Sequence, residues 1–430
     1  MEIRRTNVSK KCVLLLVVFA MPLLTGCGSG NVNFTQNKIA SRVKEVQGGV
    51  DEGLSRNLYQ QITNIMGAMF GTPDSPRLMA GGLEEELVDI DNLTRSAGAV
   101  SSSRLSGEVD ANPHLDKGEG LYRQHCVHCH GINGDGKGPT AAFLNPYPRD
   151  FTMGKFKFNS TAVGEPSTHD DLHRILMNGI NGTAMPSFAL LDQGEVEALV
   201  DYVKYLSVRG QMERLLVEMA TEVSGEDEET IEVDPEMLIG DEDGDGLGAI
   251  VGKWVAAEPA VEPEAPKVPI VSEDPSGWSE EKKKALFESI GRGRDLYYTT
   301  LANCYSCHGP TQLGDGNLGL YDDWSKELYN WQTPTAEDDA KKAEFMKLGG
   351  LEPRIIKPRN LRLGQYRGGR RPLDIFYRIH NGIDGAGMPA ANADLTDDNI
   401  WDIVNFVLWL PYDQLSHPNL ELQTLDRARD

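Results

Sequence analysis

The feature that most limits how this chain can fold is a five-residue pattern that occurs twice, at residues 126–130 and 304–308. Both copies read Cys-x-x-Cys-His, the pattern of covalent haem attachment, in which two thiols add to the porphyrin vinyl groups and the adjoining imidazole ligates the iron. The spacing of one helical turn spans the two vinyl groups and sets the histidine under the metal. The repeat therefore predicts two covalently bound haem c groups, attached to the cysteines Cys126, Cys129, Cys304 and Cys307.

Paired cysteines also serve other chemistries. A Cys-x-x-Cys pair can be half of a zinc site, a redox dithiol or a disulfide, and the four cysteines together can build one tetrahedral zinc cage. None of these alternatives needs a histidine directly after the second cysteine, yet both copies have one, His130 and His308. The pattern favours haem over the alternatives.

A Met-Pro pair lies downstream of each copy, at the end of the similar stretches 179–186 and 382–389. Because motif and Met-Pro recur in the same order, we expect His130 and Met185 to ligate the first iron, and His308 and Met388 the second. Ligation by two histidines is the alternative, since five further histidines lie near the motifs: His125, His128, His169, His173 and His380. No downstream histidine recurs at the equivalent position of the other copy, so methionine is favoured.

A Pro-Arg pair also recurs, ending at Arg149 in the first copy and at Arg359 in the second. Arginine is suited to bidentate pairing with the carboxylates of haem propionates. A surface position is the alternative, and the sequence leaves both interpretations open.

The N-terminus carries an export signal. Basic residues through Lys11 precede the apolar run 12–24, which is too short to span a bilayer and suits the hydrophobic core of a signal peptide. The tetrapeptide Leu-Thr-Gly-Cys ending at Cys27 resembles the lipidation site of bacterial lipoprotein precursors. This resemblance implies a signal peptide over residues 1–26, lipid attachment at Cys27, and a protein lipid-anchored to a bacterial membrane, facing the periplasm or the cell exterior. A plain secretory signal with an unrelated cysteine is the alternative.

The chain is strongly acidic, with a formal net charge of -23. Residues 1–26 hold four basic groups and one acidic group, so their removal leaves -26. This charge argues against nucleic acid as a partner and favours redox proteins with basic docking surfaces.

Length and composition leave room for two or three domains in 430 residues. After the signal peptide we expect a tether with one amphipathic helix over 54–70. The predicted segments are 27–111 for this tether, 112–209 for the first haem domain, 210–277 for a helical end and an acidic Pro-rich linker, 278–414 for the second haem domain, and 415–430 for a tail.

The second haem domain contains an insertion. His130 and Pro148 are 18 positions apart, whereas His308 and Pro358 are 50 apart. The additional residues fall at 321–356, which we expect to form a covering flap or a partner contact.

Each copy follows a Gly-x-x-x-aromatic sequence, Gly118 with Tyr122 in the first, and precedes an amphipathic helix, predicted over 195–206 in the first. With these features the chain resembles class I cytochrome c over about half its length. The resemblance implies a mainly α fold with two helical cytochrome c-like domains, and a helix crossing made by Gly118 and Tyr202. It also implies a backbone carbonyl that accepts the Nδ1 proton of the histidine, at Pro139 in the first domain. The second domain has Leu318-Gly319 near that place and no proline, so the sequence leaves the partner of His308 open.

An iron held by imidazole and thioether stays six-coordinate in both oxidation states, which suits electron transfer. We therefore expect a membrane-anchored dihaem c-type cytochrome of a bacterial respiratory chain, as a carrier or a subunit of a quinol-oxidising or terminal oxidase complex. One alternative is an electron acceptor for a periplasmic dehydrogenase. Another is a dihaem peroxidase, which the two Met-Pro pairs disfavour. No catalytic residue is predicted. The sequence favours an electron-transfer protein or a non-catalytic subunit of an oxidoreductase complex over an enzyme, and leaves enzyme status open.

Overall fold

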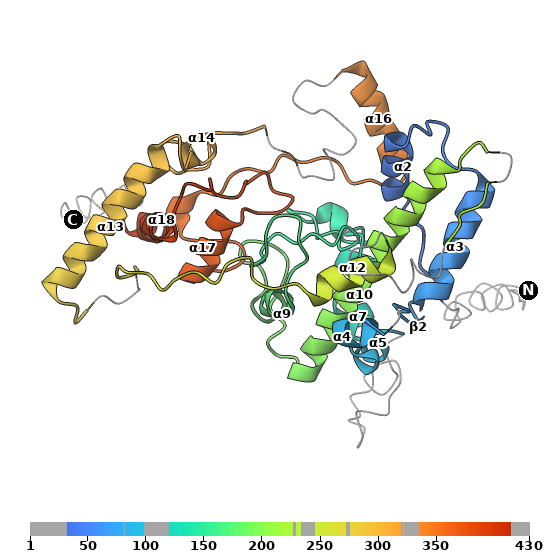
Figure 1. The fold of residues 1–430 in the computed structure, drawn as a ribbon. Coiled ribbons are helices and arrows are strands. Elements are labelled where there is room, and N and C mark those ends of the chain that lie inside the picture. The colour runs from blue at the N-terminus through green and yellow to red at the C-terminus, as the bar shows by residue number, and fades with distance from the viewer. Residues whose placement is uncertain are drawn as a thin grey trace, which may run out of the picture. The chain divides into compact units, whose positions relative to one another are not determined.

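The computed structural model describes residues 32–80, 82–98, 120–226, 229–233, 246–271, 276–319, 321 and 335–413. Cys27 and Gly118 lie outside these residues. The regular elements of the described chain are helices apart from one short pair of strands, so the predicted mainly α fold is confirmed (Figure 1). Its apolar side chains form two hydrophobic cores, one drawn from residues 54–254 and the other from residues 286–410.

The elements around the first core come from three stretches of chain. Before the first motif lie α2 (Lys38–Gln47), α3 (Arg56–Phe70), the antiparallel pair β1 (Gly71–Thr72) and β2 (Ser75–Pro76), α4 (Glu84–Leu87) and α5 (Ile90–Ser96). The motif and its downstream chain form α7 (Leu121–His125), α8 (Val127–His130), η2 (Ala141–Phe143), α9 (His169–Asn178) and α10 (Gln193–Glu222), and α12 (Leu247–Val255) follows.

The second core is built from the C-terminal part of the chain. Its elements are α13 (Glu280–Tyr298), α14 (Cys304–His308), α16 (Ala336–Lys347), η3 (Leu361–Leu363), α17 (Pro372–His380), α18 (Asp397–Trp409) and η4 (Leu410–Tyr412).

Helix α3 lies within the stretch predicted to form one amphipathic helix. Ser55 caps its N-terminus by accepting a hydrogen bond from the backbone N–H of Leu58. Its buried face joins the first core, and the carbonyl of Phe70 accepts a hydrogen bond of 2.6 Å from the hydroxyl of Tyr205 on α10. The segment before the first motif is therefore an integral part of the first domain's packing and holds more helices than the one predicted.

Helix α10 is much longer than the helix predicted over 195–206. It begins with a capping box between Asp192 and Glu195 and continues to Glu222. Its second half stays helical because apolar side chains such as Met212 and Leu216 are fully buried in the first core. In Figure 1, α10 passes among α2, α5 and α12, all of which contact it.

Part of the predicted acidic linker also belongs to the first core. Trp254 on α12 packs against Phe156 and donates a hydrogen bond of 2.9 Å from Nε1 to Gln211 on α10. Farther along, the linker follows α18: Trp401 donates to the carbonyl of Glu264, and Asn405 donates to the carbonyl of Pro269, each at 3.0 Å. The linker therefore has fixed contacts with both cores.

Helices α13 and α18 cross at Gly293. A β-carbon at this position would lie 1.9 Å from the carbonyl oxygen of Asp402, so only glycine permits the approach. Beside the crossing, Tyr297 packs against Phe406 with ring centroids 5.5 Å apart. In the first domain the matching aromatic pair is Tyr122 and Tyr202, at 4.9 Å.

The ends of the predicted insertion meet, because Tyr321 pairs with Ile355 in an antiparallel bridge. Its helix α16 reaches α2 through an ion pair of 2.7 Å between Glu344 and Arg42. Near the end of the insertion, the guanidinium of Arg354 stacks 3.9 Å above the ring of Tyr147. It also donates hydrogen bonds to the carbonyls of Ala142 and Leu144. The described part of the insertion thus lies against the first haem domain.

In the part of the chain that the structure describes, no helix combines the length and the apolar character needed to cross a bilayer.

We expect G293A to lower the free energy of unfolding of the second domain by about 1–3 kcal/mol, the usual cost of overpacking a tight contact. Denaturation followed by circular dichroism measures the effect. G291A is the matched control, because it lies in the same helix and nothing lies within 4 Å of the added carbon. The control should leave stability unchanged or raise it by up to about 1 kcal/mol. Equal destabilisation by the two substitutions would contradict the assigned crossing.

Candidate haem sites

The first motif forms one turn of helix. Cys126 joins α7 to α8, and the N–H groups of Cys129 and His130 both donate to its carbonyl. In the second motif, α14 covers the whole pattern from Cys304 to His308. The predicted helical turn between the two cysteines is present in both copies.

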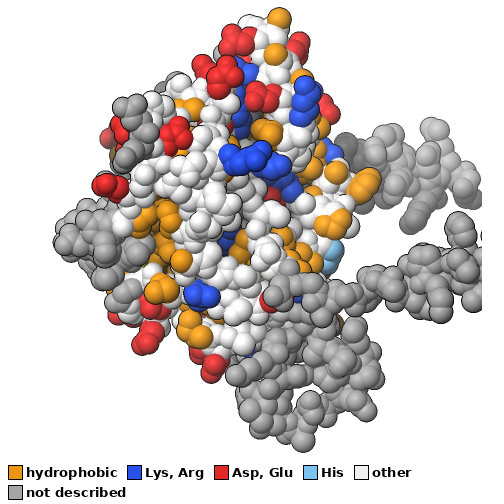
Figure 2. Space-filling model, turned by 90° about the vertical axis from the view of Figure 1, so that its right-hand side faces the viewer, with side chains coloured by type: hydrophobic (Ala, Val, Ile, Leu, Met, Phe, Trp, Pro, Cys, Tyr) orange, Lys and Arg blue, Asp and Glu red, His pale blue; other side chains and the backbone are white. Residues whose placement is uncertain are grey.

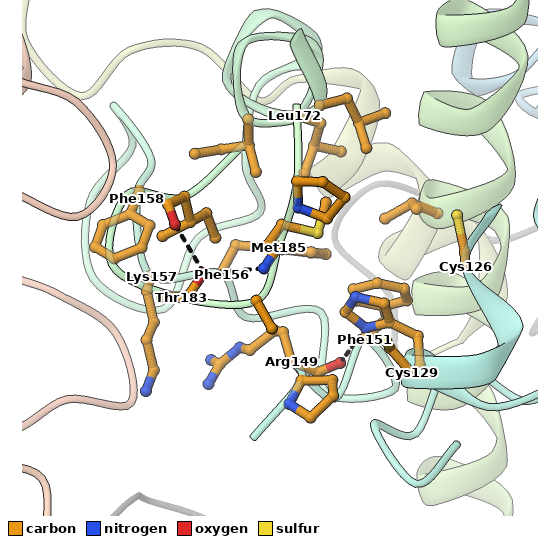
Figure 3. A pocket seen from close by; sticks show the side chains of 18 of the residues that line it. Cys126, Cys129, Arg149, Phe151, Phe156, Lys157, Phe158, Leu172, Thr183 and Met185 are labelled. Atoms are coloured by element: carbon orange, nitrogen blue, oxygen red, sulfur yellow. Dashed lines mark hydrogen bonds between the residues drawn. The ribbon is translucent and has the colours of Figure 1, made fainter. Parts of the chain in front are cut away.

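The side chains expected to hold the first haem meet at one cavity. Cys126, Cys129, His130 and Met185 all line a cavity of about 440 Å³. In Figure 3, Cys126 lies at the helical side of this cavity and Met185 enters it from a loop on another side. Most of the remaining lining is apolar, including Phe151, Phe156, Leu172 and Leu176, which suits the body of a porphyrin.

The imidazole of His130 is held in one orientation. Its Nδ1 lies 3.0 Å from the carbonyl oxygen of Arg149, and because a carbonyl only accepts, Nδ1 carries the proton. The ring stacks on Phe151 at 4.4 Å and is only 9% exposed. Burial lowers the pKa of His130 to about 4. The ring is therefore neutral at physiological pH, with Nε2 available to ligate a metal.

The second domain repeats this arrangement. Nδ1 of His308 lies 3.1 Å from the carbonyl oxygen of Arg359, and burial lowers the pKa of His308. The expectation that Pro139 supplies the carbonyl was wrong, and the partner of His308, which the sequence left open, is the carbonyl of Arg359. The recurring Pro-Arg pair was the signal for the carbonyl, because it brings the same backbone atom to both histidines.

Each predicted methionine ligand sits in the same kind of loop. The N–H of Ile180 donates to the carbonyl of Met185 at 3.1 Å, and the N–H of Ile383 donates to that of Met388 at 2.9 Å. The loops turn at Gly179 and Gly382, whose φ angles of +65° and +78° favour glycine. Both methionines are thus presented by one backbone geometry.

Three of the five rival histidines have other partners. His169 and His173 on α9 face Glu197, with Nε2 to carboxylate oxygen distances of 2.6 and 3.6 Å. His380 bonds Asn381 through Nδ1 at 2.6 Å and stacks on Phe376. The other two, His125 and His128, line the first cavity beside the motif.

The four motif cysteines form no disulfide. Burial raises the pKa of Cys126 to about 12 and that of Cys304 to about 11, so both are protonated near neutral pH. Among the described residues, no cluster of three or more His, Cys, Asp or Glu side chains is placed to hold a metal ion. The four cysteines therefore do not form the zinc cage that the sequence left open.

Basic side chains are placed to meet haem carboxylates. Arg149 and Lys157 line the first cavity. In the second domain, Nη2 of Arg359 is buried and has no hydrogen-bond partner among the described residues. An orphaned guanidinium nitrogen, on the residue whose backbone carbonyl holds His308, fits a group that brings its own carboxylates, as haem does.

A helical domain that turns two thiols, a neutral imidazole and a thioether toward one apolar cavity has the site of a c-type cytochrome. The comparison with protein families agrees: residues 113–203 and 288–407 match the family described as cytochrome C oxidase, cbb3-type, subunit III. The chain therefore carries two cytochrome c domains. Such domains imply covalently bound haem c and a role in electron transfer.

Among solved structures, the chain is similar to a chain of the reducing HAO-like protein complex of Kuenenia stuttgartiensis. The identity is 23% and the TM-score 0.41, with 67% of this chain and 93% of that chain covered. No curated protein matches the sequence.

The two methionine loops differ at one hydroxyl. Thr183 accepts a hydrogen bond of 3.1 Å from the N–H of Met185 and donates one of 2.8 Å to the carbonyl of Ile180 (Figure 3). The equivalent residue in the second loop is Ala386, which has no hydroxyl.

We expect T183A to make Met185 about fivefold easier to displace by added imidazole, since one such hydrogen bond contributes about 1 kcal/mol. Loss of the near-infrared sulfur-to-iron band measures the displacement.

T183S keeps the hydroxyl and is the matched control for T183A. It should bind imidazole like the wild type. If T183A and T183S behave alike, the hydroxyl does not hold the Met185 loop.

Proposed function

We propose that this protein is a two-haem electron carrier, attached to a bacterial membrane by a lipid on Cys27, that exchanges electrons with a respiratory complex. The observation that carries the proposal is the repetition of one ligand geometry. Both histidines donate Nδ1–H to the carbonyl of an arginine, and both methionines close the same backbone loop.

The bound haem would supply an iron that takes up and releases a single electron. The chain's own residues keep that iron's surroundings constant. The carbonyls of Arg149 and Arg359 fix the imidazole rings and increase their basicity as ligands. Met185 and Met388 would each supply a second ligand to the iron, which would leave no open site for oxygen or peroxide. Such a pair of domains suits a carrier better than a peroxidase.

The hydroxyls of two buried tyrosines donate hydrogen bonds to the loops that follow the histidines. Tyr122 donates to the carbonyl of Gly131 at 2.8 Å, and Tyr297 donates to that of Gly309 at 2.7 Å. Both rings are essentially fully buried. A rigid histidine loop lowers the structural change that accompanies electron transfer, which is what a carrier needs.

The likeness to an oxidase subunit family and the acidic charge support a respiratory partner with a basic surface. Figure 2 shows one face on which Asp and Glu side chains lie mainly toward the margin, with a smaller group of Lys and Arg near the top. The attachment at Cys27 rests on the lipidation sequence alone, because that residue lies outside the described part of the chain.

We expect the purified protein to contain two covalently bound haems and to bind no carbon monoxide in the ferrous state. In M185A the first iron loses its thioether, so this variant should bind one carbon monoxide per chain and lose about half of the sulfur-to-iron band. M177L, a change at a nearby methionine on α9, is the control and should keep both properties. A pyridine haemochrome assay gives the haem count. One haem per chain, or carbon monoxide bound by the wild type, would contradict the proposal.

Membrane attachment can be tested with C27S. Because the substitution removes the thiol that accepts lipid, we expect the wild-type protein in the detergent phase of a phase-partitioning extract and C27S in the aqueous phase. C12S, a change in the predicted signal peptide, is the control and should partition like the wild type. Equal partitioning of C27S and wild type would refute the lipid anchor.

The same membrane extract identifies the partner. We expect the wild-type protein to co-purify with a membrane oxidoreductase complex after mild detergent extraction. Co-purification with a soluble periplasmic dehydrogenase would contradict the respiratory assignment.

A further inference from the structure

One residue that lines the first haem cavity comes from the second domain. Every other lining residue lies between 124 and 203, but Arg367 is part of the lining as well. It belongs to the segment between η3 and α17. The cavity that holds Cys126 and Met185 is therefore completed by a basic side chain from the other haem domain.

The segment that carries Arg367 is anchored at both ends. Before it, the buried hydroxyl of Tyr366 donates to the carbonyl of Val407 on α18 at 2.8 Å. After it, Arg378 on α17 donates to the carbonyl of Arg367 itself and, at 2.6 Å, to that of Gly369. Burial lowers the pKa of Arg378 to about 10, which leaves it charged at neutral pH. The position of Arg367 is thus set by the second core.

The two domains touch beside this segment. Gly368 has a φ of +78°, and a β-carbon there would lie 2.4 Å from the ring of Phe158, another residue of the cavity lining. On the same side, Asn381 donates to the carbonyl of Ser160 at 2.7 Å, and the N–H of Gly164 donates to Asp384 at 3.0 Å. These contacts hold the second domain against the rim of the first cavity.

The two methionine loops take part in the same contact. A β-carbon at Gly385, in the loop of Met388, would lie 2.8 Å from Nη1 of Arg149 in the first domain. A β-carbon at Gly182, in the loop of Met185, would lie 3.8 Å from Nη2 of Arg359 in the second domain. Several cationic groups therefore gather where the two domains meet, and this arrangement suits a group with carboxylates bound there.

We propose that Arg367 completes the first haem site across the domain contact, by pairing its guanidinium with a propionate carboxylate of the haem attached to Cys126 and Cys129. The proposal rests on the haem binding proposed above. A positive charge near the porphyrin stabilises the iron after it gains an electron, since that electron lowers the net charge of the site. Contact with the second domain thus raises the reduction potential of the first haem.

The test is a redox titration of the holoprotein, comparing the wild type with R367Q, R367K and R370Q. R370Q is the matched control, because it removes the same charge from the same segment. Arg370 bonds the hydroxyl of Tyr412 at 2.9 Å and does not line the cavity. An M185H variant marks which transition belongs to the first haem, because it replaces that haem's ligand.

We expect R367Q to lower the ferrous-to-ferric ratio of the first haem about three- to tenfold at a given potential. A tenfold change corresponds to about 59 mV for a one-electron couple. In R367Q, the ferrous-to-ferric ratio of the second haem should change less than that of the first. R367K should restore most of the ratio of the first haem, and R370Q should lower it less than R367Q does. A merely structural role for Arg367 would not produce rescue by lysine.

Three outcomes would overturn the proposal: an unchanged potential of the first haem in R367Q, equal shifts in R367Q and R370Q, or equal shifts of both haems in R367Q. Haem content separates this failure from failure of the proposed function. If R367Q keeps two haems and its first haem keeps its potential, only the role of Arg367 is refuted. If the wild type itself holds fewer than two haems, the proposed function fails as well.

Discussion

The structure depends on one hydrogen bond made twice, from the imidazole Nδ1–H of a motif histidine to the backbone carbonyl of an arginine. In the first domain it joins His130 to Arg149 at 3.0 Å, and in the second it joins His308 to Arg359 at 3.1 Å. The bond fixes the tautomer, the ring plane and the basicity of Nε2 together. Burial lowers the pKa of both rings, so each histidine is neutral and its Nε2 is suited to ligate a metal.

The rest of each domain keeps that bond in place. Aromatic pairs at the helix crossings, Tyr122 with Tyr202 and Tyr297 with Phe406, pack the helix before each motif against the closing helix. The first domain adds a large outer layer from α2, α3, α5 and α12, all packed on α10. The second domain is smaller, but its inserted segment reaches back to the first domain through Arg354. This packing holds the proposed haem ligands of both domains in place, together with the contact between the two domains.

Much of the haem chemistry was predictable because it depends on short-range pattern. The two motifs and two Met-Pro pairs occur in one order, and a helical turn is a local structure, so the cavity formed by Cys126, Cys129, His130 and Met185 was expected. The carbonyl partner of the histidine was assigned wrongly to Pro139, because backbone carbonyls carry no residue-specific signal. The length of α10 was also underestimated, since its second half is helical through packing against distant residues such as those of α12.

By itself, the sequence determined the kind of cofactor, the number of motifs and the candidate axial ligands, because these follow from side-chain chemistry at fixed spacing along the chain. Only the tertiary structure decided which backbone atoms hold the histidines, which segments outside the haem domains join the first core, and that Arg367 reaches the cavity of the other domain. The physical reason is distance: these contacts join residues tens to hundreds of positions apart, and no local pattern records which surfaces meet when two cores pack against each other.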